Sequence, residues 1–250
     1  MKRMKYHKSV LTRALLLPMF QVAMRLIGST ISHQSYMSDD ETREEGDVIS
    51  NITSVSAVTC VAKLNESLVF REFNKAKDCL EKMFDVPNLS GFNMSAPTFQ
   101  RIFYSGLVSF WVGREMDDKK WTDKGVESKV AIEKMVESAS AWNFLNKAQL
   151  LQAEEQFCDR NYEEAERLYD AAILSSKEHM FLNEEALANE LAGHFYLETG
   201  RRNKSLHYFS QAIAKYNEWG AIAKANMLAK YLDGNGSVSV PVMQPVPTLS

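Results

Sequence analysis

The chain has 250 residues, of which 45% are hydrophobic and 24% charged, and its formal net charge at pH 7 is −3. This length supports a sizeable core, and the charge argues against nucleic acid as a partner, because nucleic-acid-binding surfaces concentrate Lys and Arg. Only 11 Gly and 6 Pro occur, so helix breakers are scarce and an all-helical fold is favoured.

Residues 1–28 are predicted to form an amphipathic helix, because apolar residues from Leu11 to Ile27 recur at helical spacing. Residues 1–38 contain Lys and Arg but no Asp or Glu, which is also typical of a mitochondrial or plastid transit peptide. Charged and polar residues interrupt the apolar run, so it does not fit a membrane span. A docked first helix in a cytoplasmic protein and an organelle-targeting segment therefore stand as alternatives.

Two polar segments are predicted to lie outside the fold. Residues 29–56 form an acidic polar linker that contains DDETREEGD at 39–47, where self-repulsion favours solvated backbone. Residues 233–250 are rich in Gly, Ser, Val and Pro without an apolar period, which is typical of a disordered tail.

Residues 57–232 are predicted to form helical repeats, because apolar stripes at helical spacing alternate with short polar links. The expected helix pairs are 57–70 with 73–84, 98–113 with 129–142, 146–158 with 161–176, and 184–199 with 203–219. Within the second pair, the charged residues 117–125 are interpreted as a turn. A short helix at 221–231 is expected to fold back over the end of the stack as a cap.

The last two pairs share a pattern in which small residues alternate with aromatic ones on one helix face. Small residues let helix backbones approach, and aromatic side chains fill the space beside them. The pattern comprises Tyr162, Ala165, Tyr169, Ala172, Gly193, Tyr196, Gly200, Ser205, Phe209, Ala212, Tyr216, Trp219 and Gly220. Asn161 and Glu164 are predicted to form a capping box, and Gly200 to cap a helix C-terminus.

The pattern resembles the tetratricopeptide repeat, a helix-turn-helix unit of 34 residues. From Ala165 to Ser205 the spacing is 205 − 165 = 40 residues, and the surplus of six is assigned to the link around residues 179–184. The predicted fold is therefore all-α, a right-handed superhelical stack of antiparallel helix pairs of the TPR-like α-solenoid kind.

The stretch YNEWG at 216–220 is predicted to end the last repeat. Trp219 is expected to be a buried apolar anchor at the helix end, and Gly220 to supply the turn. A Trp219 that binds a ligand is the alternative.

Residues 142–228 are similar to a segment of very large multi-domain signalling kinases. The similarity is carried by Ala186–Leu191, Phe195-Tyr196, Gly200 and Tyr216-x-x-Trp219-Gly220-Ala221-x-Ala223-Lys224. In those proteins a Ser/Thr-kinase-like domain and an AAA-type ATPase domain precede a helical-repeat region, and GAF and histidine-kinase domains follow it. The resemblance implies that only the repeat region is present here, with a role in signal transduction linked to such an ATPase or hybrid kinase.

No catalytic motif is found in the sequence. GxxxxGK[ST], HRD, DFG and GxSxG motifs are missing, and three widely spaced cysteines make no CxxC pair. His194, His207 and Glu198 lack the spacing of a known metal site. We therefore expect a non-catalytic scaffold without cofactor or metal. An organelle-targeted assembly factor and an enzyme with an unrecognised site are the alternatives.

By the resemblance, the first helices of the last two pairs would present a face to a protein partner. This predicted partner face comprises Lys147, Leu150, Glu154, Phe157, Leu187, Glu190, His194, Leu197 and Glu198. It is mixed and somewhat acidic, which suits a basic or amphipathic helix from a partner such as an ATPase or kinase. Charge reversal at Glu190 and Glu198 is expected to weaken binding without unfolding the chain.

Overall fold

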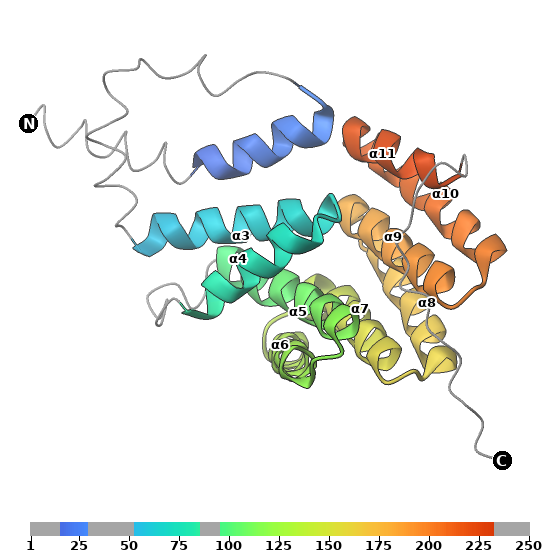
Figure 1. Ribbon diagram of the computed structural model, residues 1–250, viewed down its shortest axis with the longest axis horizontal. Coiled ribbons are helices and arrows are strands. Elements are labelled where there is room, and N and C mark those ends of the chain that lie inside the picture. The colour runs from blue at the N-terminus through green and yellow to red at the C-terminus, as the bar shows by residue number, and fades with distance from the viewer. Residues whose placement is uncertain (1–15, 30–52, 86–95, 233–250) are drawn as a thin grey trace, which may run out of the picture.

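A computed structural model describes residues 16–29, 53–85 and 96–232, and the regular secondary structure within these ranges is entirely helical. The all-α prediction is thus confirmed for this part of the chain. Figure 1 shows the helices stacked in chain order, with consecutive helices side by side. Most of the predicted linker, the predicted tail and residues 1–15 lie outside the described residues.

The first described helix covers residues 16–27. The helices that follow are α3 (Thr53–Val69), α4 (Phe73–Asp85), α5 (Ala96–Met116), α6 (Lys119–Ser138), α7 (Ala141–Cys158), α8 (Tyr162–Glu178), α9 (Leu182–Glu198), α10 (Arg202–Trp219) and α11 (Ile222–Leu232). The predicted helix pairs are present, and α11 follows them as predicted. Among the described helices, none combines the length and the apolar character that crossing a membrane requires.

The start of α6 differs from the prediction, because residues 119–125 are helical and not a turn. Asp118 accepts a hydrogen bond from the backbone N–H of Lys120 and caps this helix. Trp121 and Gly125 face the core, and the intervening charged residues point to solvent. Gly125 was read as a turn residue, but it lies against the ring of Phe110, where a Cβ atom would be only 2.7 Å away.

The links between the later helices recur with a regular period. Residues with positive φ lie at 160, 180, 200 and 220, so one helix and its link take 20 residues and one pair takes 40. The link between α8 and α9 has three residues, 179–181, as do the links at 159–161 and 199–201. The surplus over a 34-residue repeat therefore lies in longer helices, and its assignment to the link at 179–184 was wrong.

The alternation of small and aromatic residues forms the contact between paired helices. The buried members are Ala165, Tyr169, Ala172, Gly193, Tyr196, Ser205, Phe209, Ala212 and Tyr216. Tyr162, Gly200 and Trp219 are exposed. Most residues of the pattern are thus buried where neighbouring helices pack, whereas their assignment to a TPR-like repeat and the right-handed superhelical twist stay predictions.

Two predicted caps have different outcomes. Gly220 has φ 88° and caps α10 in the left-handed conformation, as predicted. The capping box at Asn161 is not formed, since the Asn161 side chain makes no cap hydrogen bond and donates to Gln156 instead. The Asn161 side chain is instead directed toward Gln156 of the preceding helix.

The helix over residues 16–27 joins the two ends of the described fold. Its buried side chains, Val22 and Leu26, share a core cluster with Val69 of α3 and with Ala225 and Leu228 of α11. Figure 1 shows this helix alongside α3, with its end next to α11. The first segment of the chain is therefore packed against the last repeat as well as the first.

We predict that Gly193→Ala destabilises the fold by about 1–3 kcal/mol, the range for overpacking a filled core. A Cβ atom at this position would lie 2.6 Å from two ring atoms of Phe209, which is itself buried. At an exposed helix position, Gly→Ala would instead increase the free energy of unfolding, since Ala is the better helix former. Urea unfolding followed by circular dichroism gives the free energy of unfolding.

The exposed Ser210 on α10 provides the control, because Ser210→Ala is expected to change the free energy of unfolding by less than about 0.5 kcal/mol. A Gly193→Ala variant as stable as the unaltered chain would show that α9 and α10 do not approach as closely as described.

Candidate binding groove

The candidate site is a cavity of about 240 Å³ enclosed by the helix over residues 16–27 and four helices of the array. Its walls come from α3, α5, α9 and α10, which are far apart in the sequence. The lining residues are Met19, Val22, Ala23, Leu26, Val58, Val61, Ala62, Asn65, Val69, Gln100, Tyr104, Asn183, Glu184, Leu187, Tyr216 and Trp219. We call the space between these four helices the groove.

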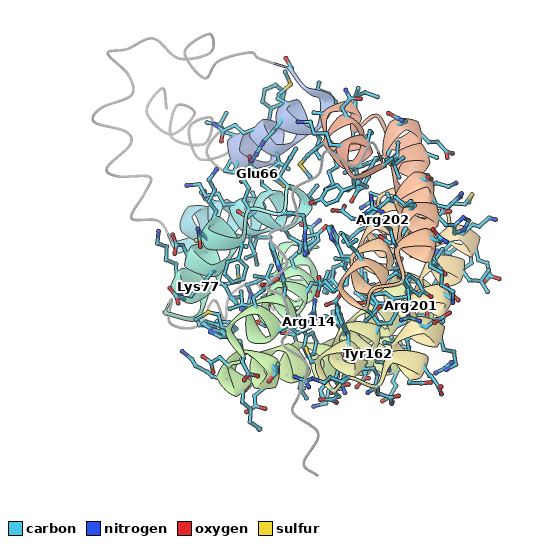
Figure 2. All side chains as sticks on the ribbon, turned by 45° about the vertical axis from the view of Figure 1, so that its right-hand side comes forward. Glu66, Lys77, Arg114, Tyr162, Arg201 and Arg202 are labelled. Carbon is cyan, nitrogen blue, oxygen red and sulfur yellow. The ribbon has the colours of Figure 1, made fainter. Side chains whose placement is uncertain are left out.

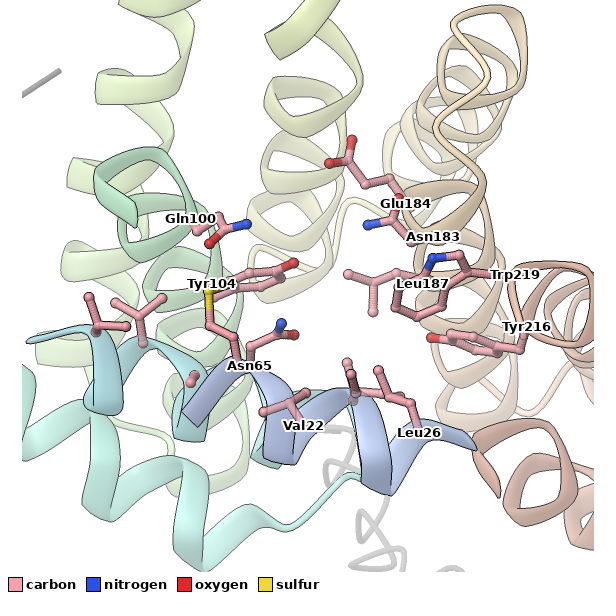
Figure 3. A pocket seen from close by; sticks show the side chains of 16 residues that line it. Val22, Leu26, Asn65, Gln100, Tyr104, Asn183, Glu184, Leu187, Tyr216 and Trp219 are labelled. Atoms are coloured by element: carbon pink, nitrogen blue, oxygen red, sulfur yellow. The ribbon is translucent and has the colours of Figure 1, made fainter. Parts of the chain in front are cut away.

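Figure 3 shows two opposed walls. Asn65, Gln100 and Tyr104 lie on one side, and Leu187 and Trp219 lie on the other. Val22 and Leu26 reach the groove from the helix over residues 16–27. The lining is mainly apolar with a few polar groups, which is the usual composition of a recognition site.

Trp219 is the main departure from prediction at this site. It ends α10 as expected, but 42% of its surface is exposed, so the prediction of a buried anchor was wrong. Its ring borders the groove beside Leu187 (Figure 3). Gly220 turns the chain directly after Trp219, and this early turn leaves the indole at the groove mouth instead of under α11. The alternative interpretation, a ligand-binding Trp219, gains support.

One polar edge of the groove is organised by Glu184. Its carboxylate accepts hydrogen bonds from Asn146 and from Lys147, whose Nζ lies 2.7 Å from Oε2. Lys147 is thereby held between α7 and α9. Burial raises the pKa of Tyr104, which also borders the groove, so this phenol keeps its proton and can donate a hydrogen bond.

A buried ion pair supports the wall formed by α10. Glu190 Oε1 lies 2.6 Å from Lys224 Nζ, and the Tyr216 hydroxyl donates to Glu190 Oε2 at 2.7 Å. Glu190 and Lys224 are 1% and 0% exposed, so water does not screen their charges. The pair joins α9, α10 and α11, and it fixes Tyr216, whose ring lines the groove.

This environment shifts the pKa values of the groups around it. Burial alone would raise the pKa of Glu190, but the charge of Lys224 and the contact with His194 bring it down to about 2. Burial lowers the pKa of His194 to about 4, with a further lowering from the charge of Arg71. At neutral pH the site therefore holds a carboxylate, an ammonium group and an uncharged imidazole.

A second buried carboxylate is satisfied in the same way. Glu154 accepts hydrogen bonds from Arg114 Nη1 at 2.6 Å and from the Tyr169 hydroxyl at 2.7 Å. The Arg114 guanidinium also lies over the Phe157 ring, 4.2 Å from its centre. Figure 2 shows Arg114 in the middle of the array. This network connects α5, α7 and α8.

Most of the predicted partner face is inside the isolated chain. Leu150, Glu154, Phe157, Leu187, Glu190 and His194 are buried. Lys147 and Leu197 are partly accessible, and Glu198 is exposed. Leu187 alone of these nine residues lines the groove. Charge reversal at Glu190 would disrupt its ion pair with Lys224, which argues against the expectation that this change leaves the fold intact.

The ion pair of Lys224 and the groove walls on α3 and α5 were not predicted from the sequence. A usable signal for Lys224 was present, because it lies on the same helix face as Ala221, Ala225 and Leu228, which are all buried. A lone lysine on such an apolar face predicts a buried acidic partner. Asn65, Gln100 and Tyr104 carry no comparable signal, since only the stacking brings them together.

No metal site is found in the parts of the chain that the structure describes, where no three His, Cys, Asp or Glu side chains are grouped suitably. His194 is buried against Glu190, whereas His207 is exposed on α10.

We predict that the stability of the chain falls between pH 6.5 and pH 4 through His194. Its pKa is about 4 in the fold and 6.5 ordinarily, so the unfolded chain binds a proton first as the pH drops. The contribution is complete above pH 6.5 and amounts to about 3 kcal/mol. Urea unfolding at pH 7, 6 and 5 should give a flatter profile for His194→Gln.

The exposed His207 is the matched control, and His207→Gln should leave the pH profile of the unaltered chain in place. An equally steep profile for His194→Gln would contradict the assignment. Glu190 acts in a separate window, where stability is lost from about pH 4.5 down to its pKa of about 2.

We also predict that Lys224→Met lowers the free energy of unfolding by about 3–5 kcal/mol, because the buried Glu190 would lose its counter-charge. The double variant Glu190→Gln/Lys224→Met should recover much of this loss, since neither charge then remains buried. Chemical denaturation measures both. A tolerated Lys224→Met single variant would mean that water reaches the pair.

Comparison of the chain with protein-family models, with curated proteins and with solved structures found no match in any of the three. The similarity of residues 142–228 to the helical region of large signalling kinases therefore stays a prediction, and the function is inferred from the groove.

Proposed function

We propose that this chain is a non-catalytic helical-repeat scaffold that binds a protein partner in the groove. The observation that carries this proposal is the convergence of side chains from α3, α5, α9 and α10 on one apolar groove with the half-exposed Trp219 at its edge. Exposed Trp is enriched among residues that dominate protein–protein binding. Packed helix repeats commonly display such composite surfaces.

The titratable groups favour a scaffold over an enzyme. A lowered pKa such as that of Glu190 often marks a catalytic group, but ion-pair networks shift pKa values too. Glu154 and Glu190 each have a cation and a tyrosine hydroxyl as partners, and each joins three helices. Both carboxylates are buried, and their hydrogen-bonding and charge partners all lie within the fold.

The chemistry of the groove suggests a basic or amphipathic helix as its partner. Glu184 borders the groove, and Glu66 and Glu72 lie at the junction with the helix over residues 16–27. Apolar walls with acidic edges complement a helix that has an apolar stripe and basic flanks. The resemblance of residues 142–228 supports a partner in signal transduction, such as an AAA-type ATPase or a hybrid kinase.

The test is recovery of the partner from cells that produce the full chain. We expect Trp219→Ala to reduce the bound partner at least about tenfold, because a Trp that dominates an interface contributes about 2 kcal/mol or more. Lys119→Ala on the exposed side of α6 is the control. Equal recovery with Trp219→Ala, in a variant whose helicity and melting are unchanged, would refute a groove-bound partner.

A further inference from the structure

The helix over residues 16–27 already meets the groove as a bound helix would. Met19, Val22, Ala23 and Leu26 line the groove, at positions i, i+3, i+4 and i+7. This spacing puts them on one face of the helix, and it is the pattern by which amphipathic helices dock into apolar grooves. The chain thus shows which type of ligand its groove accepts.

A charged clamp fixes this helix beside the groove. Arg25 Nη1 donates to Glu66 at 2.6 Å and Nη2 to Glu72 at 2.8 Å, and the guanidinium lies 3.9 Å from the centre of the Phe70 ring. Figure 2 places Glu66 next to this helix. The hydrogen bond from Arg25 lowers the pKa of Glu72, consistent with a charged pair. A cation at i+6, counted from Met19, therefore meets Glu66 and Glu72 when a helix lies in this register.

The helix does not fill the groove. Val22 and Leu26 are buried, but Met19 remains 47% exposed and Ala23 presents only a methyl group. The remaining cavity of about 240 Å³ has room for several water molecules, since each takes about 30 Å³ in the liquid. A helix with a larger side chain at the position of Ala23 would fit better.

We propose that the groove is a docking site for an amphipathic helix of a partner protein, and that residues 16–27 occupy it as a competitor within the same chain. This inference rests on the proposed function and adds the register of the partner helix and its competition with residues 16–27. The partner helix carries apolar side chains at i, i+3, i+4 and i+7, with a large one at i+4, and an Arg at i+6.

The test uses the full chain with a protease site introduced between residues 36 and 42. After cleavage, the N-terminal fragment is removed by gel filtration, and circular dichroism checks that the array remains helical. Fluorescence anisotropy then measures binding of a labelled peptide that spans residues 14–29. We expect saturable binding to the cleaved chain, and binding at least about tenfold weaker to the uncleaved chain because the helix in cis competes.

Peptide variants test the contacts one by one. Ala23→Leu should bind about tenfold tighter, because it buries additional CH₂ groups. Val22→Asp should abolish binding, and Arg25→Glu should weaken it at least about tenfold. A cleaved chain with Glu66→Arg and Glu72→Arg should restore binding of the Arg25→Glu peptide, because opposite charges then meet again.

Three results would overturn the inference. They are equal binding of the unaltered and Val22→Asp peptides, equal binding to cleaved and uncleaved chains, and a full chain that dimerises by exchanging residues 16–27 between copies. A different result would contradict the proposed function: the peptide binds, but recovery of cellular proteins does not depend on Trp219. If the inference holds, the Ala23→Leu peptide also displaces the recovered partner.

Discussion

The carboxylate of Glu190 is the buried charge on which the arrangement of the last three helices depends. Lys224 cannot be buried on the inner face of α11 without a counter-charge, and Glu190 supplies it from α9. The second oxygen of Glu190 holds the Tyr216 hydroxyl, so α10 is fixed by the same group. Because the ring of Tyr216 forms part of the groove wall, the shape of the candidate site follows from an interaction that does not itself face the groove. A buried ion pair contributes little net stability, but it penalises alternative packings that would separate its charges.

Glu154 shows that this arrangement is used twice. It takes a tyrosine hydroxyl from the second helix of its own pair, α8, and a cation from a neighbouring helix, α5. Glu190 takes a tyrosine hydroxyl from α10 and a cation from α11. In both cases an acid on a first helix connects its pair to a helix outside the pair, α5 for Glu154 and α11 for Glu190. The acidic residues that made the first helices resemble a partner face therefore act between repeats, which explains why so much of that face is buried.

Local patterns predicted the helices and the 40-residue period, because apolar spacing and small residues such as Gly193 are set by contacts between helices adjacent in the sequence. The start of α6 was missed because Gly125 resembles a turn residue unless its contact with Phe110 is known. The exposure of Trp219 depends on how α11 passes the end of α10, and no local pattern records that. The groove was unpredictable for a related reason. Its walls on α3, α5, α9 and α10 are brought together by the whole stack and by the helix over residues 16–27.

The space left in the groove and the helix over residues 16–27 that covers it are both expected of a site where an internal helix is displaced by an external one. A helix in the same chain acts at a high effective concentration, so even a weak contact keeps the groove occupied. If residues 16–27 filled the groove as tightly as a core, an external helix would have to replace that packing in full before gaining anything. Only Val22 and Leu26 of the internal helix are buried, and a side chain larger than that of Ala23 would fit at its position. An external helix therefore has less packing to replace when it displaces residues 16–27. The Arg25 clamp then sets orientation and register more than affinity, since its charges are partly exposed and screened by solvent. A partner helix with a cation at the position of Arg25 and with larger apolar side chains would form the same clamp and bury more apolar surface. It would therefore displace residues 16–27, so the groove is selective without being permanently blocked.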